Sequence, residues 1–296
     1  MNNNLHKNCL ICNSSDIKEL TKYSNNFLVK CNSCGLVFCE PIPSQQELNN
    51  YYKVYAYENN YYSPITKQRY IELLKKFEQF RVTNNLLDVG CGNGFFLEVA
   101  KNHGWNVYGT EYSEKAIEIL QEKRIKAFKG ELNINNFKPE MFDIITSFEV
   151  MEHINNPQEE IRKFNYLLRK EGGLYITTPN FNSVSRNLLK QKWNIINFPE
   201  HLTYYSVKTL KQLLINNGFE KKYSLTTGFS ISRYRQSKSI KELKTETTVK
   251  NIDENLRKKL EKKALMFYFV KIVNILLSFF NKGDTIKVFY IKTISK

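Results

Sequence analysis

The chain is 296 residues long and 42% apolar, enough to bury a large core, which excludes a disordered or fibrous protein. Lys and Arg number 44 against 29 Asp and Glu, and the net charge of +15 favours anionic partners such as phosphate groups, nucleic acid or a lipid surface. The first residues lack the basic and apolar runs of a secretory signal, and the apolar stretch 264–280 is shorter than the roughly 20 residues that cross a bilayer. We therefore expect a soluble, cytoplasmic protein.

Four of the six cysteines fall in two C-x-x-C pairs near the amino terminus, Cys9 with Cys12 and Cys31 with Cys34. Two thiolate pairs of this spacing complete a tetrahedral site, and zinc is the ion that such a site prefers. The site is expected to be structural, because four thiolates leave no position open for water. Disulfides are the alternative, which a reducing compartment disfavours. The spacing thus predicts a zinc ribbon over residues 1–40.

Residues 41–80 are expected to link the ribbon to the main domain. Six tyrosines crowd between residues 51 and 62, and we expect most of their rings to cover the main domain. Alternatively, one or two of them close over a bound ligand, since tyrosine has both an apolar face and a hydroxyl. Apolar residues at helical spacing then predict a helix over 69–80.

A strand, a glycine-rich turn and a helix are expected over residues 86–102, an arrangement in which backbone N–H groups approach a ligand closely. Gly90, Gly92 and Gly94 give the pattern G-x-G-x-G, whereas the nicotinamide fingerprint requires its third glycine one position later. The turn also lacks the Lys-Ser/Thr pair of a phosphate loop. Asp88 would repel a pyrophosphate in front of the turn, so the turn is better suited to a cationic ligand.

An acidic residue, Glu111, ends the next strand, where it can accept hydrogen bonds from both hydroxyls of a ribose. With the glycine turn it begins a series of six motifs, in consistent order and spacing, by which residues 68–226 resemble the class I S-adenosylmethionine (SAM)-dependent methyltransferases. The resemblance implies SAM as cofactor and an α/β, Rossmann-like sheet of seven strands, six parallel and one antiparallel, within a domain at 81–296. The cofactor contacts that it implies are Asp88, Gly90, Cys91, Gly92, Gly94, Glu111, Tyr112, Glu131, Leu132 and Phe148.

The later motifs define the expected end of the sheet. A strand at 142–148 precedes a helix at 157–168, and strands at 219–226 and 285–291 are expected to be the sixth and seventh. They leave residues 227–284 as an insertion, charged at first and apolar afterwards. The apolar half is most simply a helix packed on the core or against a second copy in a homodimer. With its flanking lysines, it can alternatively rest on an anionic membrane or a lipid-linked substrate.

Two histidines are candidates for a catalytic base. His201 lies in a loop that resembles the Glu-His loop of sugar methyltransferases with an amino-terminal zinc knuckle, where the histidine is the proposed base. By that resemblance Glu200 orients His201, and Tyr204 or Tyr205 binds substrate. A histidine with an ordinary pKa near 6.5 is suited to take a proton near neutrality, although a Glu-His pair can equally anchor a loop. His153 is the second candidate, with a hydrogen bond at a helix terminus as the alternative role.

These features predict a SAM-dependent methyltransferase that methylates an oxygen of a small anionic, carbohydrate-type acceptor, such as a nucleotide sugar or a surface-glycan precursor in polysaccharide biosynthesis. The further domain of sugar carbon-methyltransferases does not fit in the remaining chain, which disfavours carbon methylation. Nucleic acid is disfavoured as a partner, because the loop after the fourth strand lacks an Asn-Pro-Pro-aromatic set and a Pro-Cys pair. The alternatives are an RNA methyltransferase, which the net charge and zinc ribbon favour, and a scaffold that binds SAM without turnover.

Overall fold

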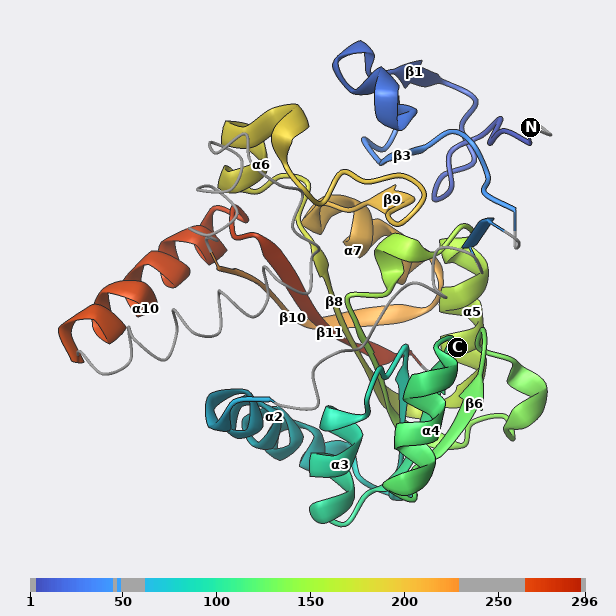
Figure 1. The fold of residues 1–296 in the computed structure, drawn as a ribbon, viewed down its shortest axis with the longest axis vertical. Helices are drawn as coiled ribbons and strands as arrows, with labels where there is room; N and C mark the ends of the chain where they lie inside the picture. Colours follow the sequence, from blue (N-terminus) through green and yellow to red (C-terminus); the bar gives the residue numbers. More distant parts are fainter. Residues whose placement is uncertain (1–3, 45–46, 49–61, 229–263, 294–296) are drawn as a thin grey trace.

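The computed structural model describes residues 4–44, 47–48, 62–228 and 264–293 (Figure 1). Of the six crowded tyrosines, Tyr62 lies within these ranges and the other five lie outside them. The charged first half of the expected insertion also lies outside the described residues.

The main domain is built on a seven-stranded sheet with the order β10-β11-β8-β7-β4-β5-β6. Strand β11 runs antiparallel to both of its neighbours, and the other six strands share one direction. This confirms the expected sheet of six parallel strands and one antiparallel strand. The bounds are β4 Asn85–Val89, β5 Asn106–Glu111, β6 Lys126–Lys129, β7 Phe142–Phe148, β8 Leu168–Pro179, β10 Phe219–Thr227 and β11 Thr285–Lys292.

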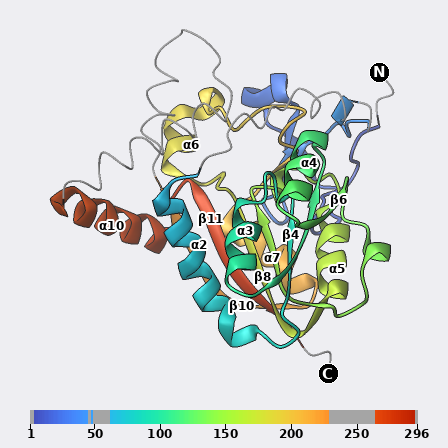
Figure 2. The same cartoon turned by 60° about the horizontal axis from the view of Figure 1, so that its bottom comes forward.

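Helices cover both faces of the sheet (Figures 1 and 2). Because successive side chains of a strand point to opposite faces, Leu86 and Leu87 of β4 enter two different apolar cores. Helices α2, α3 and α4 close the core that contains Leu86, and α5 and α7 close the other. The helices are α2 Pro64–Phe77, α3 Phe95–Asn102, α4 Glu114–Glu122, α5 Pro157–Leu167, α6 Val184–Leu189, α7 Val207–Asn216 and α10 Ala264–Phe279. Short 3₁₀ turns are η1 Thr21–Asn26, η2 Glu78–Phe80, η3 Ile134–Asn136, η4 Met151–His153 and η5 Lys190–Lys192.

The amino-terminal segment forms a second, smaller sheet. Strands β1 (Ile17–Glu19), β2 (Leu28–Cys31) and β3 (Val37–Cys39) pair in antiparallel fashion. A two-residue strand of the main domain, β9 (Thr203–Tyr204), extends this sheet by pairing with β3. The ribbon is therefore joined to the segment that directly follows the Glu-His loop, a connection that the sequence did not predict.

Several helix ends are set by local capping. The side chain of Ser206 accepts a hydrogen bond from the backbone of Thr209 and so begins α7. Helix α2 begins five residues earlier than predicted, because the Ser63 side chain caps it and Pro64 occupies its first turn. Helix α5 ends at Leu167, and strand β8 begins at the next residue, Leu168.

Candidate active site

The glycine turn between β4 and α3 lies at the carboxyl edge of the parallel strands, where ligands bind in open α/β sheets. The backbone N–H groups of Gly90 and Cys91 both donate to the carbonyl of Thr110, at 3.0 Å each. Gly90 has a φ of +70°, and a Cβ at this position would lie 2.4 Å from Cγ2 of Val150. Glycine is thus required at Gly90 by both conformation and space, which keeps the backbone of the turn open to a ligand.

The carboxylate of Glu111 connects this turn to the end of β5. Its two oxygens accept hydrogen bonds from the backbone N–H of Gly92, at 2.8 Å, and of Ser113, at 2.9 Å. Each carboxylate oxygen has a further lone pair, so the group retains capacity for the hydroxyls of a ribose. The predicted position of Glu111 beside the glycine turn is thus compatible with a nucleoside ligand.

Asp88 lies beneath the turn and is 2% exposed. Its Oδ1 accepts a 2.7 Å hydrogen bond from the hydroxyl of Thr146 on the neighbouring strand β7. Burial raises the pKa of Asp88 to about 8; the Thr146 hydrogen bond opposes this rise and the nearby charge of Glu111 adds to it. A buried carboxyl group that is costly to ionise gains a favourable partner when a cation binds at the turn, which fits the sulfonium and amine of SAM.

The other predicted cofactor contacts differ in their surroundings. Phe148 packs against Phe96 and Tyr70, with ring centroids 5.1 and 6.2 Å apart, so an aromatic wall borders the turn. Leu132 is buried in the core, whereas the adjacent Glu131 is exposed. Cys91 and Tyr112 are half-buried and lie just after the ends of β4 and β5. The structure therefore gathers the predicted set at one edge of the sheet.

The two candidate histidines meet at this same edge. His153 in η4 and His201 before β9 have ring centroids 4.7 Å apart. Nδ1 of His153 lies 2.6 Å from the carbonyl oxygen of Glu200, and Nδ1 of His201 lies 2.5 Å from that of Ile195. Since a carbonyl only accepts, Nδ1 is the donor in both contacts, which leaves Nε2 of each ring as the nitrogen that can take a proton.

A carboxylate that the sequence analysis missed completes this cluster. Glu152 is 3% exposed, and a carboxylate oxygen of Glu152 and a ring nitrogen of each histidine lie within 4.8 Å of one another. Oε2 of Glu152 accepts a 2.9 Å hydrogen bond from the hydroxyl of Thr178. Its position next to His153 in the sequence was the available signal. Such a cluster can hold a proton on one of its rings. Its carboxylate oxygen and imidazole nitrogens are also atoms that can bind a metal cation.

The expected role of Glu200 needs correction. Its Oε2 accepts a 2.7 Å hydrogen bond from Nδ2 of Asn197, and its backbone carbonyl serves His153. Nδ1 of His201 is held by the carbonyl of Ile195 and not by the Glu200 carboxylate. Glu200 therefore contacts the loop through its backbone carbonyl and through Asn197.

The two tyrosines after His201 are packing residues in this structure. Tyr204 and Tyr205 are both buried, and their hydroxyls donate to the carbonyls of His201 and Met151. Both hydroxyls that were expected to bind substrate therefore have backbone partners. Tyr204 also pairs with Val37 of β3 in the smaller sheet.

The four ribbon cysteines converge as predicted. Sγ of Cys9 lies 3.4 Å from Sγ of Cys34, Sγ of Cys12 lies 3.5 Å from Sγ of Cys31, and all four sulfurs lie within 4.8 Å of one another. Zinc–thiolate bonds of about 2.3 Å place tetrahedral sulfurs about 3.8 Å apart, so the spacing fits a zinc ion. All six cysteines are free thiols. Of the two that do not belong to this set, Cys39 has its pKa raised to about 12 by burial.

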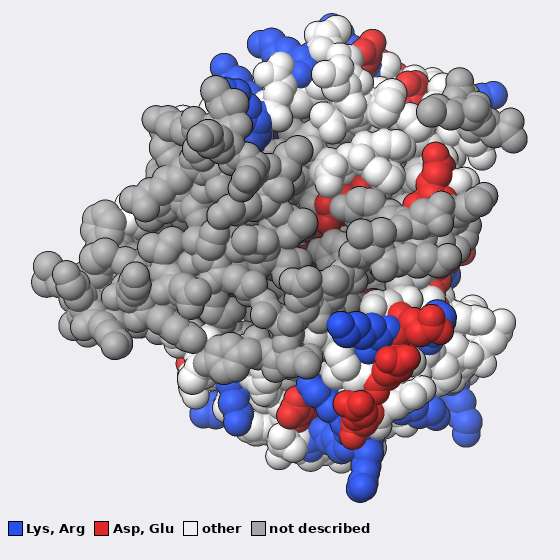
Figure 3. Space-filling view, in the orientation of Figure 1, with Lys and Arg blue, Asp and Glu red and all other residues white. Residues whose placement is uncertain are grey.

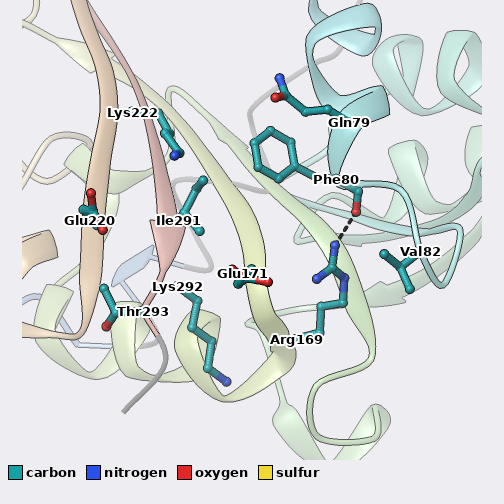
Figure 4. Close-up of a pocket in the computed structure, with 10 residues that line it drawn as sticks. All are labelled: Gln79, Phe80, Val82, Arg169, Glu171, Glu220, Lys222, Ile291, Lys292 and Thr293. Carbon is teal, nitrogen blue, oxygen red and sulfur yellow. Dashed lines mark hydrogen bonds between the residues drawn. The ribbon is translucent and has the colours of Figure 1, made fainter. Parts of the chain in front are cut away.

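A separate open pocket of about 630 Å³ lies at the opposite edge of the sheet (Figure 4). The guanidinium of Arg169 in this pocket donates to Asp143 at 2.6 Å and to the carbonyl of Phe80 at 2.5 Å. Lys292 is likewise occupied by Glu140 and the carbonyl of Leu168. These pairs join the strand ends to their neighbours, so the pocket has a structural explanation.

The strand order, the antiparallel β11 and the glycine turn together define an α/β fold of the SAM-dependent methyltransferase class. A family model described as "Methyltransferase domain" matches residues 62–223, more than half of the chain, and the protein therefore belongs to this methyltransferase family. The ribbon lies outside the matched region.

Curated relatives and solved structures agree with this assignment. The "Ubiquinone biosynthesis O-methyltransferase" of Coxiella burnetii is 30% identical over 139 residues, covering 42% of this chain and 58% of the relative. The protein of the same name from Pelagibacter ubique is 36% identical over 103 residues, covering 32% and 42%. The chain thus spans about half the length of these relatives.

Two solved structures show the fold. A SAM-dependent methyltransferase from Archaeoglobus fulgidus has a TM-score of 0.51 at 19% identity, covering 77% of this chain and 93% of that one. Phosphoethanolamine N-methyltransferase 2 of Haemonchus contortus, in complex with SAM, has a TM-score of 0.51 at 15% identity and covers 88% and 63%. At these identities the likeness concerns the fold alone.

Proposed function

We propose that this protein is an enzyme that transfers a methyl group from SAM to an oxygen of a small acceptor. The observation that carries the proposal is the meeting of His153, His201 and Glu152 at the edge that bears the glycine turn. A hydroxyl must lose its proton during methyl transfer, and a basic nitrogen at this edge is suited to take it.

The cofactor would be held by the glycine turn, with Glu111 on the ribose hydroxyls and Asp88 compensating positive charge. When bound, SAM supplies a methyl group made electrophilic by its sulfonium. The chain's own contribution is to fix the acceptor's oxygen in line with that group and to remove water and the proton. Phe148 and the rings around it provide an apolar wall for this purpose.

His201 is the proposed base. Its ring is 1% exposed, its Nδ1 proton is fixed by the carbonyl of Ile195, and its neighbours in the cluster are His153 and Glu152. The Glu152 carboxylate stabilises the imidazolium that forms when the acceptor's proton arrives. His153, which is more exposed, lies against His201 and is the alternative site for the proton.

Histidine variants test this proposal. His201→Ala should lower turnover by about 10² to 10⁴-fold while SAM affinity stays nearly unchanged, because the base acts on the acceptor and not on the cofactor. Combining it with His153→Ala should add little, since residues that act as one unit are not additive. His103→Ala, at the far end of α3, is the matched control. Near-normal turnover in both single variants would refute a histidine base.

For the acceptor we propose a carbohydrate-type hydroxyl, on the basis of the Glu-His loop and the anion-favouring net charge. The names of the curated relatives favour a second candidate, an intermediate of ubiquinone biosynthesis. Both require oxygen methylation. Product analysis with a nucleotide sugar and with such an intermediate, each with labelled SAM, distinguishes them. Methylation of RNA with a steep salt dependence would favour the RNA methyltransferase, and SAM binding without any product would favour the scaffold.

We also propose that Cys9, Cys12, Cys31 and Cys34 bind one structural zinc ion. The support is the convergence of the four sulfurs, because four thiolates complete the tetrahedral shell of a structural zinc ion. Because β3 pairs with β9, the ion would stabilise the segment that carries His201 as well as the ribbon itself.

A further inference from the structure

Helix α10 packs on the main domain through polar contacts. The backbone N–H of Gly228 donates to Oδ1 of Asn274 at 2.8 Å, and the hydroxyl of Thr226 donates to the carbonyl of Leu277 at 2.9 Å. The hydroxyl of Ser278 accepts from the backbone N–H of Thr226 at 3.3 Å. The face toward β10 is therefore the one that bears Asn274 and Ser278.

The opposite face of α10 is apolar and exposed. Its side chains are between 55% and 78% exposed, and most follow the i, i+3, i+4, i+7 spacing of one helical stripe. A helix on the surface of a globular protein normally turns such a stripe toward the core, and a contiguous exposed patch marks an interaction surface. We name this stripe the α10 stripe; it consists of Ile272, Ile275, Leu276, Phe279 and Phe280.

Basic residues border the end of the α10 stripe. Helix α6 lies beside the carboxyl-terminal end of α10 in Figures 1 and 2, and the backbone N–H of Val184 donates to the carbonyl of Lys282 at 3.0 Å. Residues 181–199 contain Arg186, Lys190 and Lys192 and no Asp or Glu, and Lys190 and Lys192 are exposed. Figure 3 has the orientation of Figure 1, in which α6 lies at the upper left. The charged side chains visible in that part of the view are Lys and Arg, whereas the lower part shows charges of both signs.

This surface lies toward the catalytic edge. Thr285 at the start of β11 pairs with Pro179 at the end of β8, so α10 leaves the sheet at the carboxyl ends of the parallel strands. The glycine turn and the histidine cluster lie at the same edge. Whatever binds the α10 stripe is thereby placed at the same edge of the sheet as the glycine turn and the histidines.

We propose that the α10 stripe and the lysines after α6 dock this protein on an anionic lipid surface. Apolar side chains would enter the acyl boundary while Lys190 and Lys192 meet lipid phosphates, the pattern of an interfacial helix. A second copy docked on the same face would bring these cations opposite one another in a chain of net charge +15, so lipid is the better occupant. Among the helices that the structure describes, none has the length and apolar character needed to cross a membrane.

Vesicle sedimentation with the full chain tests the docking. The wild type should sediment with equal mixtures of phosphatidylglycerol and phosphatidylcholine and stay in solution with phosphatidylcholine alone. Ile275→Ser combined with Phe279→Ser should weaken binding by about tenfold or more, through lost apolar burial. Lys190→Glu combined with Lys192→Glu should have a similar effect that shrinks at high salt.

Matched controls lie at the other edge of the sheet. Val82→Ser with Tyr166→Ser removes two exposed apolar side chains there, and Lys138→Glu with Lys170→Glu makes the same change in net charge. Both controls should bind vesicles like the wild type. Equal weakening in the controls, or no binding by the wild type, would overturn the proposal. A wild-type dimer that does not bind vesicles and that dissociates in Phe279→Ser would also overturn the proposal. SAM calorimetry on each variant keeps this result separate from the proposed methyl transfer.

Discussion

The glycine turn and the histidine loop lie at one edge of the sheet, but they are held in place differently. The turn is bound by partners about 20 residues away, with Gly90 against Thr110 and Gly92 against Glu111. The histidine loop is bound across the chain, since Sγ of Cys39 donates to the carbonyl of His201, 162 residues later, at 3.4 Å. The cofactor side can therefore form without the ribbon, whereas the histidine side depends on it.

Apart from the histidine variants, the largest effect is expected from breaking the ribbon. Cys31→Ser, or removal of zinc by a chelator, should unfold β2 and β3 and deprive β9 of its partner, because metal binding in such small sites is coupled to folding. Turnover should fall by about 10²-fold or more, as expected when a catalytic group is misplaced by about 1 Å. SAM affinity, measured by calorimetry, should stay within about threefold.

Ser33→Ala, a change between two of the proposed ligands at an exposed position, is the control and should leave zinc and turnover intact. Elemental analysis of the wild type should find one zinc per chain. Protein with disulfides and no metal, or chelated protein with full turnover, would show that the two halves are not coupled in this way.

On the cofactor side we expect a smaller effect, which falls on SAM affinity more than on turnover. Glu111→Ala should weaken the binding of SAM and of its demethylated product by about 10 to 10²-fold, the range for losing charge-assisted hydrogen bonds. Turnover at saturating SAM should change less, because the histidine loop is untouched. Glu114→Ala, at the exposed ion pair with Lys129, is the control. Binding of NAD in place of SAM would refute the assigned ligand.

The same contrast explains what could be predicted from the sequence. The glycine spacing and the acid at Glu111 report on backbone geometry within a single β-α-β segment, and the structure places them as expected. The pairing of Thr203 with Phe38 has no such signature, since two residues carry too little pattern to specify a strand. Local motifs thus predicted the cofactor side, and long-range contacts had to be seen.

The partners of the histidines show the same limit at the level of single atoms. The carbonyls of Ile195 and Glu200 hold the two Nδ1 protons, and a backbone carbonyl is present in every residue. A pattern of residue types therefore pointed to the Glu200 side chain instead. Glu152 was recognisable only as an acid adjacent to His153, a pairing that gains meaning once the loop returns beside it.

The last expected effect concerns the proton on Asp88. Its pKa is raised to about 8 in the folded chain, mainly by burial, from an ordinary 3.8. The neutral form therefore favours folding: this contribution is complete below about pH 4 and is lost as the pH rises to about 8. In the absence of SAM, Asp88→Asn should flatten the fall in unfolding free energy between about pH 5 and 8, by at most about 1.4 kcal/mol per pH unit.

Binding of a cation near Asp88 should reverse this preference and release a proton. At pH 7 the free protein holds that proton, and the positive charge of SAM favours the carboxylate, so binding should release up to about one proton. Calorimetry in two buffers with different ionisation enthalpies measures the release, which should vanish above about pH 9 and in Asp88→Asn. Thr146→Val, which removes the hydrogen bond that opposes the raised pKa, should extend the release to higher pH. Binding with no proton exchange at pH 7 would place the cation away from Asp88 and leave the glycine turn and Glu111 as the cofactor contacts.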